Sequence, residues 1–207
     1  MTATHEAGHA LLHYFLKNAD PLHKVTIVPH GRALGMAMSL PEEDSYSRTK
    51  NWIQDRITIM YGGWAAEKLI FSETTTGTRQ DIQQATDFAR RMVCEWGMAE
   101  DVGPVSFGQE DEPIFIGKEI ARHKDYSEET AKRIDEAVKK ILNTSVEAAS
   151  KILSKQKDKL EKLTEALIRE ETLLDDEIRT LLELPPRENS LSLADSGGNG
   201  KEAAPAE

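Results

Sequence analysis

The stretch His5-Glu6-Ala7-Gly8-His9, close to the start of this 207-residue chain, has the spacing H-E-x-x-H. Residues four apart lie on one face of an α-helix, so both imidazoles can reach a single metal ion. A carboxylate at the second position lies beside that ion, where it can take a proton from an attacking water and give it to a leaving amine. The spacing therefore predicts a helix with a site for zinc-dependent amide hydrolysis.

The residues that follow the motif continue an amphipathic helix. Leu12 and Leu16 extend the histidine face toward a core, and Asn18 and Pro21 end the pattern. A chance match to the H-E-x-x-H spacing would not be expected to lie at the start of an amphipathic helix. The context therefore supports the metal-binding interpretation.

A catalytic zinc site usually has three protein ligands and a water, so one more side chain is needed. His13 lies eight residues after His5, about 12 Å along the helix, which is too far for the two to share an ion. The longer pattern with a third histidine is absent, because Leu12 and Phe15 occupy its glycine and histidine positions. We therefore expect His13 to be a packing or surface residue.

Two carboxylates on predicted helices remain candidates for the third ligand, Glu67 and Asp81. Asp81 follows a Thr/Gly-rich segment at residues 74–78 and opens a strongly amphipathic helix. The same residue also completes a capping-box pattern with Thr78, in which it would serve only the helix-end amides. Glu67 on its own would be read as a solvated helix carboxylate. The residues alone leave these alternatives open.

The composition bounds the class of protein. With 39% hydrophobic residues the chain can bury one core, so we expect one domain over residues 1–184 and a disordered, polar tail over residues 185–207. A net charge of −10 disfavours a nucleic-acid partner. Cys94 is the single cysteine, so no disulfide can form within the chain.

Two kinds of segment are absent from the sequence. No apolar run approaches the roughly 20 residues that cross a bilayer, so we expect no membrane contact by this segment itself. No G-x-x-x-x-G-K-[ST] phosphate loop is present, so an ATP site of that type is not expected here. Because a metal-binding helix this near a free terminus would fray, we expect the chain to be part of a longer protein.

The hydrophobic patterns predict a mainly α fold: a helical zinc-peptidase domain with a small β element and a C-terminal helical bundle or hairpin. Two short strands are expected at residues 25–28 and 34–40, covering the motif helix, and one exposed edge is a hypothetical docking site for an extended substrate. One helix is expected at residues 49–72, with Gly62 and Gly63 allowing close packing on the motif helix.

The C-terminal half is expected to consist of packing helices. A strand-like patch is expected at residues 114–116, and a long helical pattern begins at Ser127. A polar break at residues 154–159 favours a folded helical hairpin over a coiled coil. A final helix is expected in the segment that contains Ile178.

Several further motifs occur in one order along the chain and carry a resemblance to a known family. They are HEAGHAL (5–11), KVTIVP (24–29), GRALG (31–35), YGG (61–63), AE (66–67), TTG (75–77), DI (81–82), AT (85–86), WGM (96–98) and GP (103–104). In these segments the chain resembles the C-terminal peptidase domain of the FtsH family, membrane-anchored AAA-type ATP-dependent zinc metalloproteases. The resemblance spans residues 2 to about 184 and is specific through residue 117.

Carried over by position, the resemblance implies His5, His9 and Asp81 as ligands of one Zn2+ per chain and Glu6 as the catalytic carboxylate. It selects Asp81 over Glu67, and Glu67 then resembles a nearby carboxylate that orients the site.

The resemblance also implies partners for this segment. These are polypeptide substrates, an AAA ATPase domain in the same full-length chain, where ATP would bind, and a homo-hexameric assembly. The full-length protein would be anchored in an inner or plasma membrane, with this domain on the cytoplasmic or equivalent side. A competing interpretation is a non-catalytic helical oligomerisation module with a residual metal site, against which an intact Glu6 argues, since structural zinc needs no base. A third is a free-standing peptidase that is independent of ATP.

Overall fold

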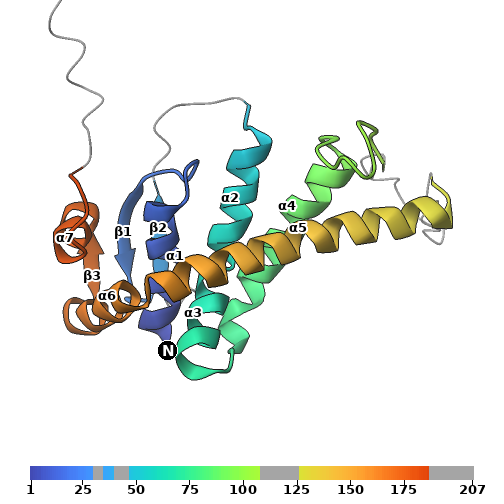
Figure 1. Cartoon of the computed structure of the whole chain (residues 1–207). Helices are drawn as coiled ribbons and strands as arrows, with labels where there is room; N and C mark the ends of the chain where they lie inside the picture. Colours follow the sequence, from blue (N-terminus) through green and yellow to red (C-terminus); the bar gives the residue numbers. More distant parts are fainter. Residues whose placement is uncertain (30–34, 40–46, 108–125, 187–207) are drawn as a thin grey trace, which may run out of the picture.

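The computed structural model describes residues 1–29, 35–39, 47–107 and 126–186 (Figure 1). Helices make up most of this part of the chain and a small antiparallel sheet accompanies them, which confirms the predicted fold class. The strand-like patch at residues 114–116 and the tail from residue 187 lie outside the described residues. The elements in chain order are α1 (Thr2–Phe15), β1 (Leu22–Thr26), β2 (Met36–Ser39), α2 (Lys50–Met60), α3 (Gly62–Phe71), the 3-10 helix η1 (Thr76–Thr78), α4 (Arg79–Cys94), α5 (Glu128–Lys155), α6 (Lys157–Glu170), β3 (Thr172–Leu174) and α7 (Asp175–Leu181).

Helix α1, which carries the H-E-x-x-H motif, packs most extensively against α3. The two helices cross at Gly8 and Gly62. A Cβ atom on Gly8 would lie 2.3 Å from the Gly62 carbonyl oxygen, and one on Gly62 would lie 2.8 Å from the backbone of Gly8. Only glycine permits such a close approach of the two backbones. The predicted close packing of these glycines on the motif helix is therefore confirmed.

The single helix predicted over residues 49–72 is wrong, because the segment forms two helices. The chain bends at Tyr61, where φ is −85° and ψ is 0°, between α2 and α3. The Gly62-Gly63 pair that follows has low helix propensity, so it does not hold the helix straight through this point. The bend sets the end of α2 and the start of α3 against the same face of α1.

The sheet has the strand order β2-β1-β3, and both pairings are antiparallel. Val25 lies opposite both Ala37 and Leu173, and it is fully buried. The first strand begins and ends earlier than predicted, at Leu22 and Thr26. The third strand was not predicted, because three residues are too few to show an alternating pattern. The sheet covers one side of α1 and leaves β2 at an edge.

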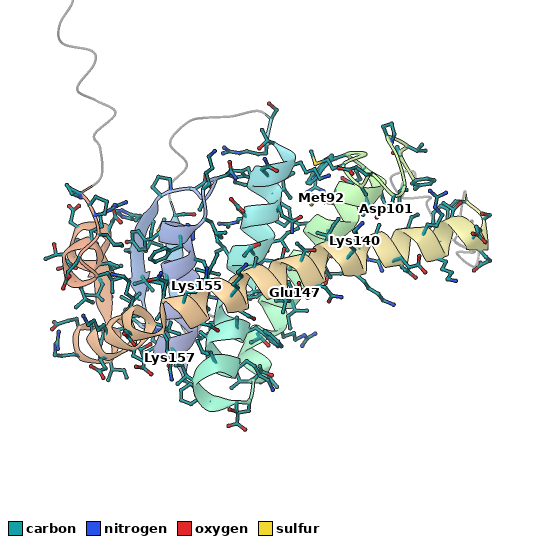
Figure 2. The ribbon with its side chains drawn as sticks, viewed as in Figure 1. Met92, Asp101, Lys140, Glu147, Lys155 and Lys157 are labelled. Carbon is teal, nitrogen blue, oxygen red and sulfur yellow. The ribbon has the colours of Figure 1, made fainter. Side chains whose placement is uncertain are left out.

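Helix α5 begins at the predicted place, where the Ser127 hydroxyl accepts a hydrogen bond from the Thr130 amide. It packs on α2, α3 and α4, and Figure 1 shows it crossing them. An exposed ion pair of 2.7 Å between Lys140 and Asp101 joins α5 to the segment after α4 (Figure 2). The predicted break is confirmed at Gln156, after which α6 packs on α1. The C-terminal helices therefore cover the helices that build the site.

Within the described ranges, no helix combines the length and the apolar character that crossing a bilayer requires.

Candidate metal centre

The two motif histidines and Asp81 bring three donor atoms together. The Nε2 atoms of His5 and His9 lie 3.1 Å apart, and Asp81 Oδ2 lies 3.3 Å from the first and 3.6 Å from the second. Among the described residues, these three side chains form the one group of histidine, cysteine or acidic residues whose donor atoms could hold a metal ion together.

The separations of these atoms fit a zinc ion. Bonds of about 2.0–2.1 Å in tetrahedral geometry place neighbouring donors about 3.3–3.4 Å apart, which lies within the observed range. Two imidazole nitrogens and one carboxylate oxygen are also a donor set typical of catalytic zinc, with a fourth position left for water. The three residues can therefore hold this metal.

The other ring nitrogen of each histidine is already engaged. His9 Nδ1 donates to the Ile59 carbonyl oxygen at 2.7 Å, and His5 Nδ1 donates to Glu67 Oε1 at 2.8 Å. A carbonyl can only accept, so the proton of neutral His9 sits on Nδ1 and leaves a lone pair on Nε2. These contacts fix the ring orientation and present both Nε2 atoms to one point.

Glu67 is held in turn by the segment before α4. It is only 2% exposed, its Oε2 accepts a hydrogen bond from the Thr75 amide at 2.6 Å, and its Oε1 accepts one from the Thr75 hydroxyl at 3.1 Å. The contact with His5 agrees with the orienting role that the resemblance implied. Thr75 was not singled out as a site residue, because its contribution comes partly from a backbone amide.

Asp81 lies in the first turn of α4 but does not act as the helix cap. The side chain of Thr78 makes no capping bond to the helix, and its hydroxyl donates to the Thr75 carbonyl instead. Burial would raise the pKa of Asp81, but its contacts with His5 and His9 outweigh that effect and hold the pKa below its usual range. The carboxylate is therefore ionised, as a metal ligand must be.

The charges around His5 favour a cation at the same point. Burial would lower the pKa of His5, but the carboxylates of Asp81, Glu67 and Glu6 outweigh burial and raise it to about 8. A metal ion bound here would displace this proton, and the same carboxylates would stabilise its positive charge.

Glu6 lies beside the three donors and belongs to none of their contacts. Its side chain is buried, and burial raises its pKa while the imidazoles of His9 and His5 oppose the rise. It packs against Gly35, where a Cβ atom would come within 2.6 Å of Glu6 Oε1. A carboxylate whose affinity for protons is raised in this way is suited to act as a general base.

The donors open into a cavity of about 1090 Å³. Its walls come from α1, the start of β2, α2, α3, the segment before α4 and the first turns of α4. Because Gly35, Met36 and Ala37 belong to this wall, the edge of β2 borders the site. Pairing of that edge with an extended substrate stays a prediction.

His13 is buried one turn beyond His9 and does not join the donor group, in agreement with the sequence analysis. Its Nδ1 donates to the Asp20 carbonyl oxygen at 2.7 Å. Burial lowers its pKa to about 4, and the nearby Arg56 adds to the effect. His13 is therefore a neutral residue in the cavity wall.

Gly63 is a further residue of the site that the sequence did not assign to it. A Cβ atom at this position would lie 2.3–2.5 Å from the ring atoms of His5. We expect Gly63→Ala to displace that ring from Glu67 and to weaken zinc binding by about 10–100-fold, the range typical of lost contacts behind a ligand. Isothermal titration of the metal-stripped protein with zinc would measure the change.

Gly77→Ala is the matched control for this substitution. A Cβ atom there would meet only the Thr75 hydroxyl, at 3.1 Å, so zinc affinity should remain near that of the unsubstituted chain. Alanine has a higher helix propensity than glycine, so loss of helix is not the expected cause of any effect at position 63. Equal affinity in Gly63→Ala and the unsubstituted chain would contradict the proposed steric role.

The model of peptidase family M41 matches residues 1–181. Similar curated proteins include the "ATP-dependent zinc metalloprotease FtsH" of Borreliella burgdorferi, 51% identical over 97% of this chain, and "ATP-dependent zinc metalloprotease FtsH 3" of Symbiobacterium thermophilum, 45% identical over 100% of it. The chain spans 32% and 34% of the length of these two relatives, respectively.

Proposed function

Because this chain belongs to peptidase family M41, we propose that residues 1–184 are the zinc metalloendopeptidase domain of a longer, ATP-dependent protease, followed by a tail at residues 185–207. The observation that carries the proposal is the group of three donor atoms, 3.1–3.6 Å apart, with Glu6 beside it. His5, His9 and Asp81 are the proposed ligands, and Glu6 is the proposed catalytic residue.

Zinc, when bound, would supply Lewis acidity and lower the pKa of a water at the fourth position. Glu6 accepts a proton from the attacking water and then donates that proton to the nitrogen of the leaving amine as the amide bond breaks. Glu67 and the Ile59 carbonyl hold the imidazoles in place through their Nδ1 atoms. The negative charge of Asp81 would offset part of the positive charge of a bound metal ion.

The substrates in this proposal are polypeptides, which enter the cavity as extended segments. The relatives are named as ATP-dependent proteases. The ATPase domain would therefore lie in the part of the full-length protein that this chain does not include. Assembly as a homo-hexamer and anchoring in a membrane by another segment follow from the family resemblance. The acidic charge of the chain supports the absence of a nucleic-acid partner.

Cleavage of unfolded casein by the purified, zinc-loaded chain tests this function. Removing zinc with 1,10-phenanthroline should abolish cleavage, and adding back zinc after the chelator has been dialysed away should restore it, because the activated water depends on the metal. Folded substrates should resist the chain, since unfolding them would require the ATPase domain. An inactive chain that contains zinc and forms a hexamer would favour the non-catalytic oligomerisation module instead.

A further inference from the structure

We propose that Arg56 is a specificity-determining residue that favours an acidic side chain of the substrate close to the scissile bond. The inference rests on the proposed peptidase function and adds a substrate preference to it. It depends on the end of the cavity that lies beyond His9, which Arg56 and His13 line together.

Arg56 carries a half-buried guanidinium that has no carboxylate partner among the described residues. It lies on α2 and lines the cavity, yet it makes no salt bridge or side-chain hydrogen bond within the described part of the chain. Its neighbour Asp55 is engaged elsewhere and accepts hydrogen bonds from the backbone and side chain of Asn18. Partial burial of a charge is unfavourable unless an opposite charge compensates it, so this position can gain from an anionic ligand.

The packing of α1 against α2 brings Arg56 near the metal centre. His9 of α1 contacts Ile59 of α2. His13 lies one turn after His9 and Arg56 lies one turn before Ile59, so both line the same end of the cavity. One turn of helix is about 5–6 Å. An extended peptide advances about 3.3 Å per residue, so a side chain one or two residues from the scissile bond can reach this end.

Among the described residues, Arg56 supplies the positive charge at this end of the cavity. His13 is neutral, since its Nδ1 donates to the Asp20 carbonyl and burial keeps its pKa low. Asp87 of α4 also lines the cavity, but it is exposed and forms no ion pair with Arg56. Arg79, another cation of the cavity wall, lies two residues from Asp81 at the start of α4. A carboxylate on the substrate can therefore reach a guanidinium that pairs with no carboxylate of the described residues.

The test compares peptides that differ only in charge. Fluorogenic peptides with Glu, Gln or Lys at each of the two positions on either side of the scissile bond are cleaved by the unsubstituted chain, Arg56→Gln, Arg56→Glu and the control Arg90→Gln. At one position the unsubstituted chain should favour Glu over Lys by about tenfold in kcat/KM, as expected for one partly desolvated ion pair. Arg56→Gln should remove this ratio and Arg56→Glu should reverse it.

Arg90→Gln changes the net charge equally at an exposed site on α4 that does not line the cavity, so its Glu-to-Lys ratio should equal that of the unsubstituted chain. An unchanged ratio in Arg56→Gln would overturn the inference, as would the absence of any ratio in the unsubstituted chain.

Binding separates this inference from the proposed function. Fluorescence anisotropy of the same peptides with Glu6→Gln measures charge preference without turnover. A preference for Glu that disappears in the double variant Glu6→Gln/Arg56→Gln supports the role of Arg56 even if the chain cleaves nothing. Cleavage of all peptides at equal rates, with equal binding, would leave the peptidase function intact and reject the specificity.

Discussion

Glu6→Gln should reduce cleavage of unfolded casein by about 10²–10⁴-fold while the protein keeps its zinc, because glutamine cannot accept the proton of the attacking water. Glutamine nearly matches the size of glutamate, so it fits the same space against Gly35. The loss should appear in kcat, with KM little changed. Steady-state kinetics together with the zinc content of each protein measure this result.

Glu73→Gln is the matched control for Glu6→Gln. Glu73 is an exposed glutamate that follows α3 and does not line the cavity, so its loss should leave kcat unaltered. Retention of full activity by a zinc-loaded Glu6→Gln protein would remove Glu6 from the mechanism. Loss of zinc from that variant would instead assign Glu6 to the ligands.

Asp81→Ala should weaken zinc binding by more than about 100-fold, beyond the cost typical of a lost contact behind a ligand, because it removes one of the three protein donors. It also removes the carboxylate nearest to both imidazole Nε2 atoms, at 3.3 and 3.6 Å. Competition for zinc against a chromophoric chelator at fixed pH measures the affinity. Casein cleavage should be lost at zinc concentrations that saturate the unsubstituted chain.

Asp87→Ala provides the comparison for Asp81→Ala. Asp87 lies on the same helix and lines the same cavity, but it does not belong to the donor group. Its removal should leave zinc affinity near that of the unsubstituted chain. Zinc bound as tightly by Asp81→Ala as by the unsubstituted chain would exclude Asp81 as a ligand and return Glu67 to consideration.

The sequence predicted those parts of the site that depend on one helix. His5, Glu6 and His9 share a turn of α1, so the helix pitch alone brings the two imidazoles together. The same reasoning correctly kept His13 away from them. The close packing at Gly62 could also be anticipated, since glycine is the residue that lets two backbones approach.

The choice between Glu67 and Asp81 could not be made from local patterns. Thr78 and Asp81 have the spacing of a capping box, yet the cap does not form and the carboxylate faces the imidazoles instead. Glu67 has the appearance of a solvated helix residue but is only 2% exposed and bonded to His5. Both outcomes depend on how α3 and α4 pack around α1.

The sequence by itself determined the helix and the face that carries His5 and His9 with Glu6 beside them, because residues four apart meet through the pitch of a single helix. The tertiary structure decided which carboxylate completes the donor group, which atoms hold the imidazoles and where Arg56 lies. His5 and Glu67 are 62 residues apart, and His9 and Ile59 are 50 apart. Contacts at such separations are set by the packing of all the helices together, which no local pattern records.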